Sequence, residues 1–114
     1  MNQKETNPRI PETHVDTMFY ERWSPRSFIK EQISKEQLLS LFEAARWAPS
    51  CFNEQPWLFI YAVSQEDHAR FLSTLVEQNQ IWARNAPVLA FAISRRYFTK
   101  SGKENRHAAF DTAA

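Results

Sequence analysis

The fold is decided by the stretch Ala48-Pro49-Ser50-Cys51-Phe52-Asn53-Glu54-Gln55-Pro56-Trp57. Its two prolines fix φ and bias the residue before each of them away from the helical region, so a helix arriving at this stretch must stop near Ala48. Between the prolines lie a hydroxyl, a thiol and two amides, which present hydrogen-bond donors and acceptors without charge. The sequence therefore predicts a pinned polar loop between a helix and a strand, suited to a planar heteroaromatic ligand.

The segment before the loop is predicted to be an amphipathic helix. Ser34 is followed by Gln37 in the pattern of a capping box, with Ser34 as the N-cap. Apolar residues then recur at helical spacing and form one stripe, which contains Leu38, Leu41, Phe42 and Ala45. This helix would carry the loop at Pro49 on its end.

Two apolar runs, residues 57–63 and 88–93, are predicted to be strands. Neither run alternates with polar residues, so we expect both faces of each strand to be covered. Ser64 with Asp67 marks the N-cap of a helix between the runs, from about residue 65 to residue 78. The apolar stripe of that helix contains Leu72, Leu75, Val76 and Asn79. On periodicity alone, a strand, helix and strand in this order favour a parallel right-handed unit.

The N-terminal residues 1–12 are predicted to be a flexible leader, because they are polar and contain prolines at positions 8 and 11. A short helix is expected to begin at Pro11, which suits a first helical turn, and to end near Glu21. Its apolar positions are Val15, Met18 and Phe19.

Two arginines, Arg22 and Arg26, follow on either side of Pro25. Guanidinium groups and a nearby hydroxyl, here Ser24, are the donors that hold a phosphate. On the residues alone, a pair of solvated surface charges remains the simpler interpretation.

The charge and cysteine content exclude several classes of partner and site. The net charge is +1, which gives no electrostatic reason to expect nucleic acid or an anionic membrane as a partner. The single cysteine, Cys51, cannot form an internal disulfide, so we expect a reducing compartment and a cytoplasmic protein. Cys51 has no nearby histidine to make a thiolate, and is interpreted as a packing residue and not a nucleophile.

No apolar run approaches the roughly 20 residues of a membrane span, and residues 1–5 lack the apolar core of a signal peptide. His68 has no second histidine or cysteine at ligand spacing, so no metal site is expected. The segment 95–106 is basic and aromatic and could contact nucleic acid. Its irregular spacing, interrupted by Glu104, favours a solvated helix start or loop.

Three blocks together resemble the FMN-dependent nitroreductase family, in both their order and their spacing. They are residues 21–28, residues 48–57, and residues 79–82 ahead of Ala86-Pro87-Val88. The resemblance covers about residues 13–112, so residues 13–114 would be the N-terminal part of a nitroreductase-like domain. It implies an α/β (α+β) fold with a mixed, largely antiparallel sheet flanked by helices and incomplete at the C-terminus, in place of the parallel unit.

The resemblance also implies an FMN site. In the family pattern the residues matching Arg22 and Ser24 hold the phosphate and ribityl chain, and the residue matching Arg26 lies near the pyrimidine edge, where its charge raises the flavin potential. Pro49 and its neighbours would face the flavin from the opposite subunit of a homodimer. The expected cofactor-binding residues are Arg22, Trp23, Ser24, Arg26, Pro49, Ser50, Asn53, Gln55 and Asn79.

Several of these residues have a simpler structural interpretation. Trp23 could pack in a core or an interface, and Asn53 and Gln55 could cap a turn. Asn79 could be a helix C-cap. Trp82 stands where some family members carry a lysine, which leaves less charge to polarise the flavin.

The family's activity is oxidation and reduction through bound flavin. Relatives take hydride from NADH or NADPH onto flavin N5 and pass electrons to nitroaromatic, quinone or similar acceptors. Because this chemistry belongs to the cofactor, no side chain is assigned a catalytic role. The family's later elements would follow residue 114, so this chain resembles only a half-site. The alternative is a truncated, flavin-free fragment or interaction module without catalytic activity.

Overall fold

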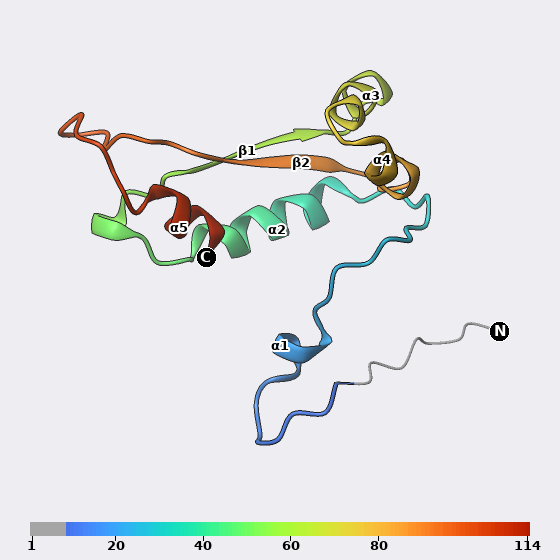
Figure 1. The fold of residues 1–114 in the computed structure, drawn as a ribbon, viewed down its shortest axis with the longest axis horizontal. Coiled ribbons are helices and arrows are strands. Elements are labelled where there is room, and N and C mark those ends of the chain that lie inside the picture. Colours follow the sequence, from blue (N-terminus) through green and yellow to red (C-terminus); the bar gives the residue numbers. More distant parts are fainter. Residues whose placement is uncertain (1–8) are drawn as a thin grey trace.

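A computed structural model describes residues 9–114 of the chain. In the described residues a two-stranded sheet runs through the body, with helices on both sides of it and an N-terminal arm that extends away (Figure 1). The elements in chain order are α1 (Thr17–Glu21), α2 (Lys35–Arg46), the 3₁₀ turn η1 (Cys51–Asn53), β1 (Trp57–Ala62), α3 (Gln65–Ser73), α4 (Glu77–Ala83), β2 (Leu89–Ser94) and α5 (Ala108–Ala113).

The two strands are antiparallel, as the family resemblance implies. Trp57 lies opposite Ser94, and Ala62 lies opposite Leu89. The parallel interpretation from periodicity is therefore wrong. The chain leaves β1 and enters β2 at the same end of the sheet, because α3 and α4 fold back. A parallel pair would need a connection that crosses to the other end of the sheet.

The single helix predicted over residues 65–78 is two helices. Ser64 caps α3 as expected, since its hydroxyl accepts a hydrogen bond from the Asp67 amide. The helix ends at Ser73, and Val76 has extended backbone angles where α4 begins. Asn79 therefore lies in the first turn of α4, where its amide donates to the Val76 carbonyl over 2.9 Å, and the C-cap interpretation is wrong.

Helix α2 begins as the sequence predicts. The Gln37 amide donates to the Ser34 hydroxyl over 3.1 Å, and the Ser34 amide donates to the Gln37 side chain over 2.9 Å, so the capping box is complete. Its apolar stripe is narrower than predicted, because Leu41 is 60% exposed. In residues 9–114 the sheet against which α2 packs has two strands.

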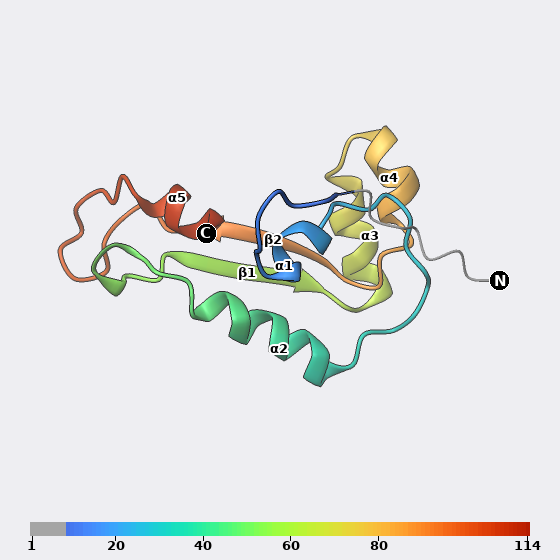
Figure 2. The same cartoon turned by 90° about the horizontal axis from the view of Figure 1, so that it is seen from below.

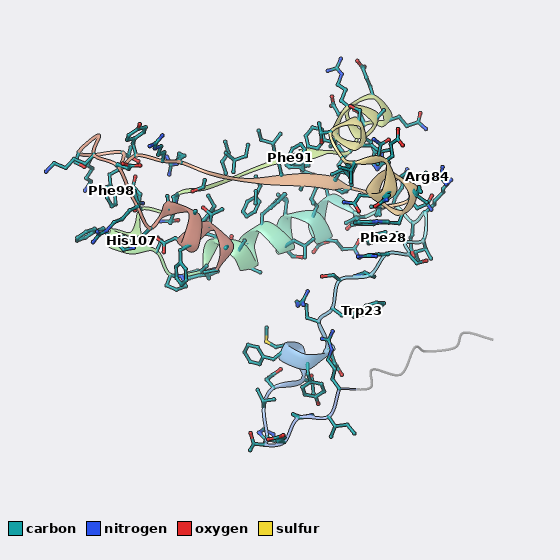
Figure 3. The ribbon with its side chains drawn as sticks, in the orientation of Figure 1. Trp23, Phe28, Arg84, Phe91, Phe98 and His107 are labelled. Carbon is teal, nitrogen blue, oxygen red and sulfur yellow. The ribbon has the colours of Figure 1, made fainter. Side chains whose placement is uncertain are left out.

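Helix α2 packs on one face of the sheet, and the opposite face is largely open. Phe42 of α2 contacts Phe59 and Tyr61 on the first face, with ring centroids 5.3 and 5.1 Å apart, although Tyr61 is still 42% exposed. On the opposite face, only α3 packs against the strands, where Phe71 stacks on Phe91 at 4.8 Å (Figure 3).

We call the apolar residues of this opposite face the open face: Leu58, Ile60, Phe91 and Ile93, with 50, 44, 38 and 38% exposure. The expectation that both faces of each strand are covered is therefore wrong for the described chain. The apolar residues that predicted coverage are present, but α3 leaves all four partly exposed, including Phe91, on which Phe71 stacks.

The N-terminal arm, residues 9–28, lies apart from the sheet in Figure 1, and in the view from below in Figure 2 it passes in front of the strands. Its helix α1 begins at Thr17 and not at Pro11, because the Asp16 carboxylate accepts from the Met18 amide over 3.0 Å and forms the N-cap. The arm joins the body where Phe28 stacks on Trp82 of α4 at 6.0 Å. The radius of gyration, 17.3 Å, exceeds the roughly 13 Å of a compact chain of about 100 residues, since the arm is extended. Most of the predicted leader, residues 1–8, lies outside the described residues.

Candidate functional site

The loop between α2 and β1, residues 48–56, has an unusual backbone for a chain segment without glycine. Phe52, Asn53 and Gln55 have φ angles of 52, 52 and 50°. This left-handed region is unfavourable for residues with a Cβ atom, so surrounding contacts must hold the conformation. We call this segment the Pro49 loop, and it is pinned as the two prolines predict.

Contacts inside the Pro49 loop close it into a tight turn. The Asn53 amide donates to the Ser50 carbonyl over 3.0 Å, and the Gln55 amide donates to the Ser50 hydroxyl over 3.0 Å. The Gln55 side-chain amide donates to the Asn53 side chain over 3.2 Å. The Ser50 hydroxyl therefore caps the turn, and the Gln55 side chain adds contacts to the side chain and carbonyl of Asn53.

The segment after β2 is hydrogen-bonded to the end of the Pro49 loop. Arg95 donates from its guanidinium to the Gln55 carbonyl over 2.9 Å, and Thr99 donates from both its amide and its hydroxyl to the Glu54 carboxylate. The chain then turns back, with a bridge between Tyr97 and Glu104. The basic segment is thus a loop, as its irregular spacing favours, and its role in holding the Pro49 loop was missed from sequence.

The two hydrogen bonds from Thr99 hold the pKa of the Glu54 carboxyl below its ordinary value, because they favour the charged form. The neighbouring charges of Arg95 and Lys100 act in the same direction. A carboxyl group with a depressed folded-state pKa stabilises the fold above its unfolded pKa, and that contribution is lost as the pH falls through the folded-state value.

We therefore expect the free energy of unfolding of Glu54→Gln to depend less on pH in the acidic range. Lowering the pH from neutral to about pH 3 should reduce the urea midpoint less in this variant than in the unaltered chain. Glu31→Gln is the control, since Glu31 is exposed and makes no ion pair with another described residue. Equal acid sensitivity in Glu54→Gln and the unaltered chain would contradict the role of Thr99.

Arg22, Ser24 and Arg26 form an exposed, cationic set on the arm. The Arg22 guanidinium lies 3.4 Å from the Ser24 hydroxyl, so the two groups point to the same side. Within residues 9–114, neither arginine forms an ion pair with a carboxylate. Two uncompensated guanidinium groups with a hydroxyl between them suit the phosphate of FMN, and the uncharged donors and acceptors of the Pro49 loop suit its ring.

One chain does not bring these two parts of the predicted site together. The arm lies well below the body in Figure 1, whereas the Pro49 loop, drawn in green, follows the end of α2. Trp23 is 51% exposed on the arm and belongs to no core of this chain (Figure 3). Asn79 is exposed on α4.

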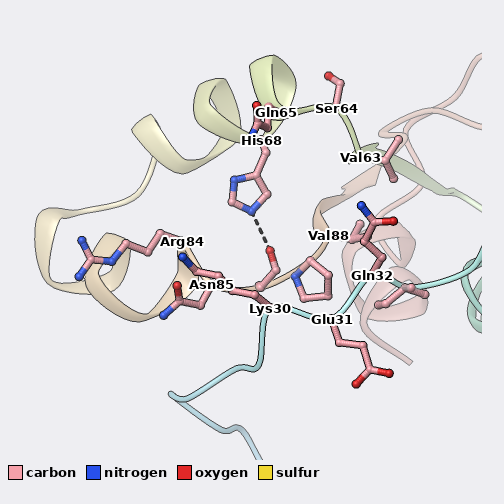
Figure 4. A pocket seen from close by; sticks show the side chains of 13 residues that line it. Lys30, Glu31, Gln32, Val63, Ser64, Gln65, His68, Arg84, Asn85 and Val88 are labelled. Carbon is pink, nitrogen blue, oxygen red and sulfur yellow. Dashed lines mark hydrogen bonds between the residues drawn. The ribbon is translucent and has the colours of Figure 1, made fainter.

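A separate pocket of about 500 Å³ lies where the arm meets the body (Figure 4). It is lined by residues of three segments, among them Lys30, His68 and Arg84. The His68 Nε2 donates to the Ala86 carbonyl over 2.8 Å and ties α3 to the start of β2. None of the predicted cofactor-binding residues lines this pocket, so it is distinct from the candidate flavin site.

Residues 9–114 lack two further classes of feature, a metal-binding cluster and a membrane-spanning helix. This part of the chain contains no group of three or more histidine, cysteine or acidic residues that could hold a metal ion. In the same residues, no helix is long and apolar enough to cross a bilayer.

The sequence model of the nitroreductase family matches residues 20–114. The chain belongs to the nitroreductase family. A relative from Streptomyces coelicolor, named as an NADH dehydrogenase/NAD(P)H nitroreductase, is 33% identical over 91 residues, which are 79% of this chain and 45% of the relative. A nitrobenzene nitroreductase from Ectopseudomonas oleovorans is 32% identical over 63 residues, which are 55% of this chain and 27% of that enzyme.

Solved structures share the fold of this nitroreductase chain. A crystal structure described as an oxidoreductase containing FMN superimposes with a TM-score of 0.88 at 45% identity, covering 96% of this chain and 57% of that one. A nitroreductase family protein from Clostridium difficile superimposes with a TM-score of 0.60 at 24% identity, covering 81% of this chain and 51% of that one, and supports the fold alone. The chain therefore spans about half the length of the family members it matches.

Proposed function

We propose that this chain provides part of the FMN site of a flavin oxidoreductase. The observation that carries the proposal is the exposed set of Arg22, Ser24 and Arg26, in which neither guanidinium is neutralised by a carboxylate of residues 9–114. Guanidinium groups are the side chains best matched to phosphate oxygens. The likeness to an oxidoreductase containing FMN, at 45% identity, supports the same conclusion.

Each predicted residue has a role in this proposal. Arg22 and Ser24 bind the phosphate and ribityl chain, Arg26 lies at the pyrimidine edge, and Trp23 packs beside them. The remaining residues contact the ring or its polar edge: Pro49, Ser50, Asn53, Gln55 and Asn79. Bound FMN supplies the redox chemistry, which is hydride acceptance at N5 from NADH or NADPH and electron transfer to nitroaromatic, quinone or similar acceptors.

A homodimer would complete the site. Since one chain keeps the arm apart from the Pro49 loop, we propose that the loop of one subunit meets the arm of the other and that the two share the flavin. The small-molecule electron acceptor would enter the same site. We also propose a cytoplasmic location, in keeping with the single cysteine.

Flavin fluorescence tests the proposal directly. Titration of FMN with the purified chain should quench the flavin emission, and a yellow colour after purification would agree with it. Absence of quenching at high micromolar protein would overturn the proposal. That outcome would favour the alternative, a flavin-free fragment or interaction module, which the uncovered open face supports because monomers seldom expose large apolar patches.

We expect Arg26→Ala to lower the midpoint potential of bound flavin and to weaken FMN binding. A cation beside the pyrimidine edge favours the negative charge that reduction adds there. Lys103→Ala is the control, since Lys103 is exposed in the loop after β2. Spectroelectrochemical titration measures both potentials, and equal shifts in the two variants would mean that only general electrostatics had changed.

A further inference from the structure

A buried carboxylate from α5 contacts the beginning of the Pro49 loop. Asp111 is 8% exposed, and its Oδ2 accepts a hydrogen bond from the Cys51 amide over 2.9 Å, across 60 residues of sequence. Helix α5 is held against both strands, and Ala108 in its first turn is buried. The acceptor for the Cys51 amide therefore comes from a part of the chain fixed on the sheet.

We propose that Asp111 is a positioning residue for the FMN site. By holding the Cys51 amide, it keeps Ser50 and Asn53 in the conformation in which they contact the flavin. The inference rests on the proposed function, and it adds a residue that does not itself touch the cofactor.

The backbone of the Pro49 loop is strained. Phe52, Asn53 and Gln55 all have positive φ, and such a backbone persists only when its surroundings fix it. The end of the loop is fixed to the segment after β2 by Arg95 and Thr99. The beginning of the loop is bonded through Ser50 to residues of the loop itself, and these contacts tie it to no other element.

Asp111 supplies the contact at that beginning. Its side-chain oxygen accepts from the Cys51 amide, and the bond at Cys51 lies next to Ser50. With both ends fixed, the residues between them are preorganised, and a ligand binding there need not order the loop. Without Asp111 the Cys51 amide has no other acceptor among residues 9–114, and FMN would have to order the loop on binding.

Two substitutions of similar size separate this role from simple packing. Asp111→Leu fills the same space without an acceptor, whereas Asp111→Asn keeps a side-chain oxygen for the Cys51 amide. We expect the leucine variant to bind FMN about tenfold more weakly, equivalent to about 1.4 kcal/mol, and the asparagine variant to retain most of the affinity. Glu104→Ala is the charge control, since Glu104 pairs with Arg96 on the surface.

Amide hydrogen exchange provides a second measurement that does not need FMN. In the flavin-free chain, exchange at Cys51 should be faster in Asp111→Leu than in Asp111→Asn, with β1 amides unchanged. Unaltered FMN affinity and unaltered Cys51 exchange in the leucine variant would overturn the inference while the proposed function stood. If the leucine variant does not fold, a tenfold loss in Asp111→Asn would overturn it. If the unaltered chain binds no FMN, the proposed function fails and this inference fails with it.

Discussion

Replacing Arg22 with alanine is expected to weaken FMN binding by about one to two orders of magnitude. A hydrogen bond to a charged group contributes on the order of 1.5–3 kcal/mol, and each 1.4 kcal/mol is about tenfold in affinity. Within residues 9–114 the Arg22 side chain makes one weak hydrogen bond, to the Ser24 hydroxyl at 3.4 Å, so its removal should cost the fold little. Quenching of flavin fluorescence during titration measures the change.

The matched control is Arg106→Ala. It removes the same charge from an exposed position in the chain after Arg95 and Thr99, which bond to the Pro49 loop. This control should bind FMN within about twofold of the unaltered chain, because solvent and salt screen an exposed surface charge. If both substitutions weaken binding equally, Arg22 acts only through net charge, and its assignment to the phosphate is wrong.

Phe42→Ala is expected to cause the largest loss of stability, about 2 kcal/mol. The Phe42 ring contacts Phe59 and Tyr61 and is the aromatic group that joins α2 to the sheet. Burial of Phe42 is partial, so the loss should be smaller than the roughly 3–5 kcal/mol of a fully buried phenylalanine. Urea denaturation followed by helical circular dichroism measures it.

Leu41→Ala provides the comparison on the same helix. Leu41 is 60% exposed, so its truncation should change the free energy of unfolding by no more than about 0.5 kcal/mol. Comparable losses at the two positions would show that α2 packs through a different face from the one observed.

Local signals predicted the starts of two helices correctly. Ser34 with Gln37, and Ser64 with Asp67, each satisfy amides within a single turn, so the information lies in adjacent residues. The break between α3 and α4 left no such signal. Leu75 and Val76 continue the apolar pattern of a helix, and only the backbone, extended at Val76, ends it.

The sequence predicted only those parts of the candidate site that are contiguous in the chain. Arg22, Arg26 and the Pro49 loop are contiguous motifs, which one sequence can reveal. The residues that hold the loop come from far along the chain, since Arg95 and Asp111 reach it across 40 and 60 residues. Long-range hydrogen bonds of this kind produce no periodic pattern or characteristic spacing in the sequence from which they could be predicted.

The wrong expectation about the open face also has a physical explanation. The apolar runs correctly predicted β1 and β2, and they also predicted cover on both faces. The apolar composition of a strand does not say which elements pack on it, and in the described residues α2 and α3 each cover part of one face.

Sedimentation velocity across a concentration series, with and without FMN, tests the central claim most directly. If the Pro49 loop of one subunit and the arm of another share the flavin, FMN binding and dimerisation are linked by mass action. FMN should then shift the chain toward a dimer at a fixed protein concentration, and Asn53→Ala should reduce that shift. A compact monomer that binds FMN with no dependence on protein concentration would contradict the shared site.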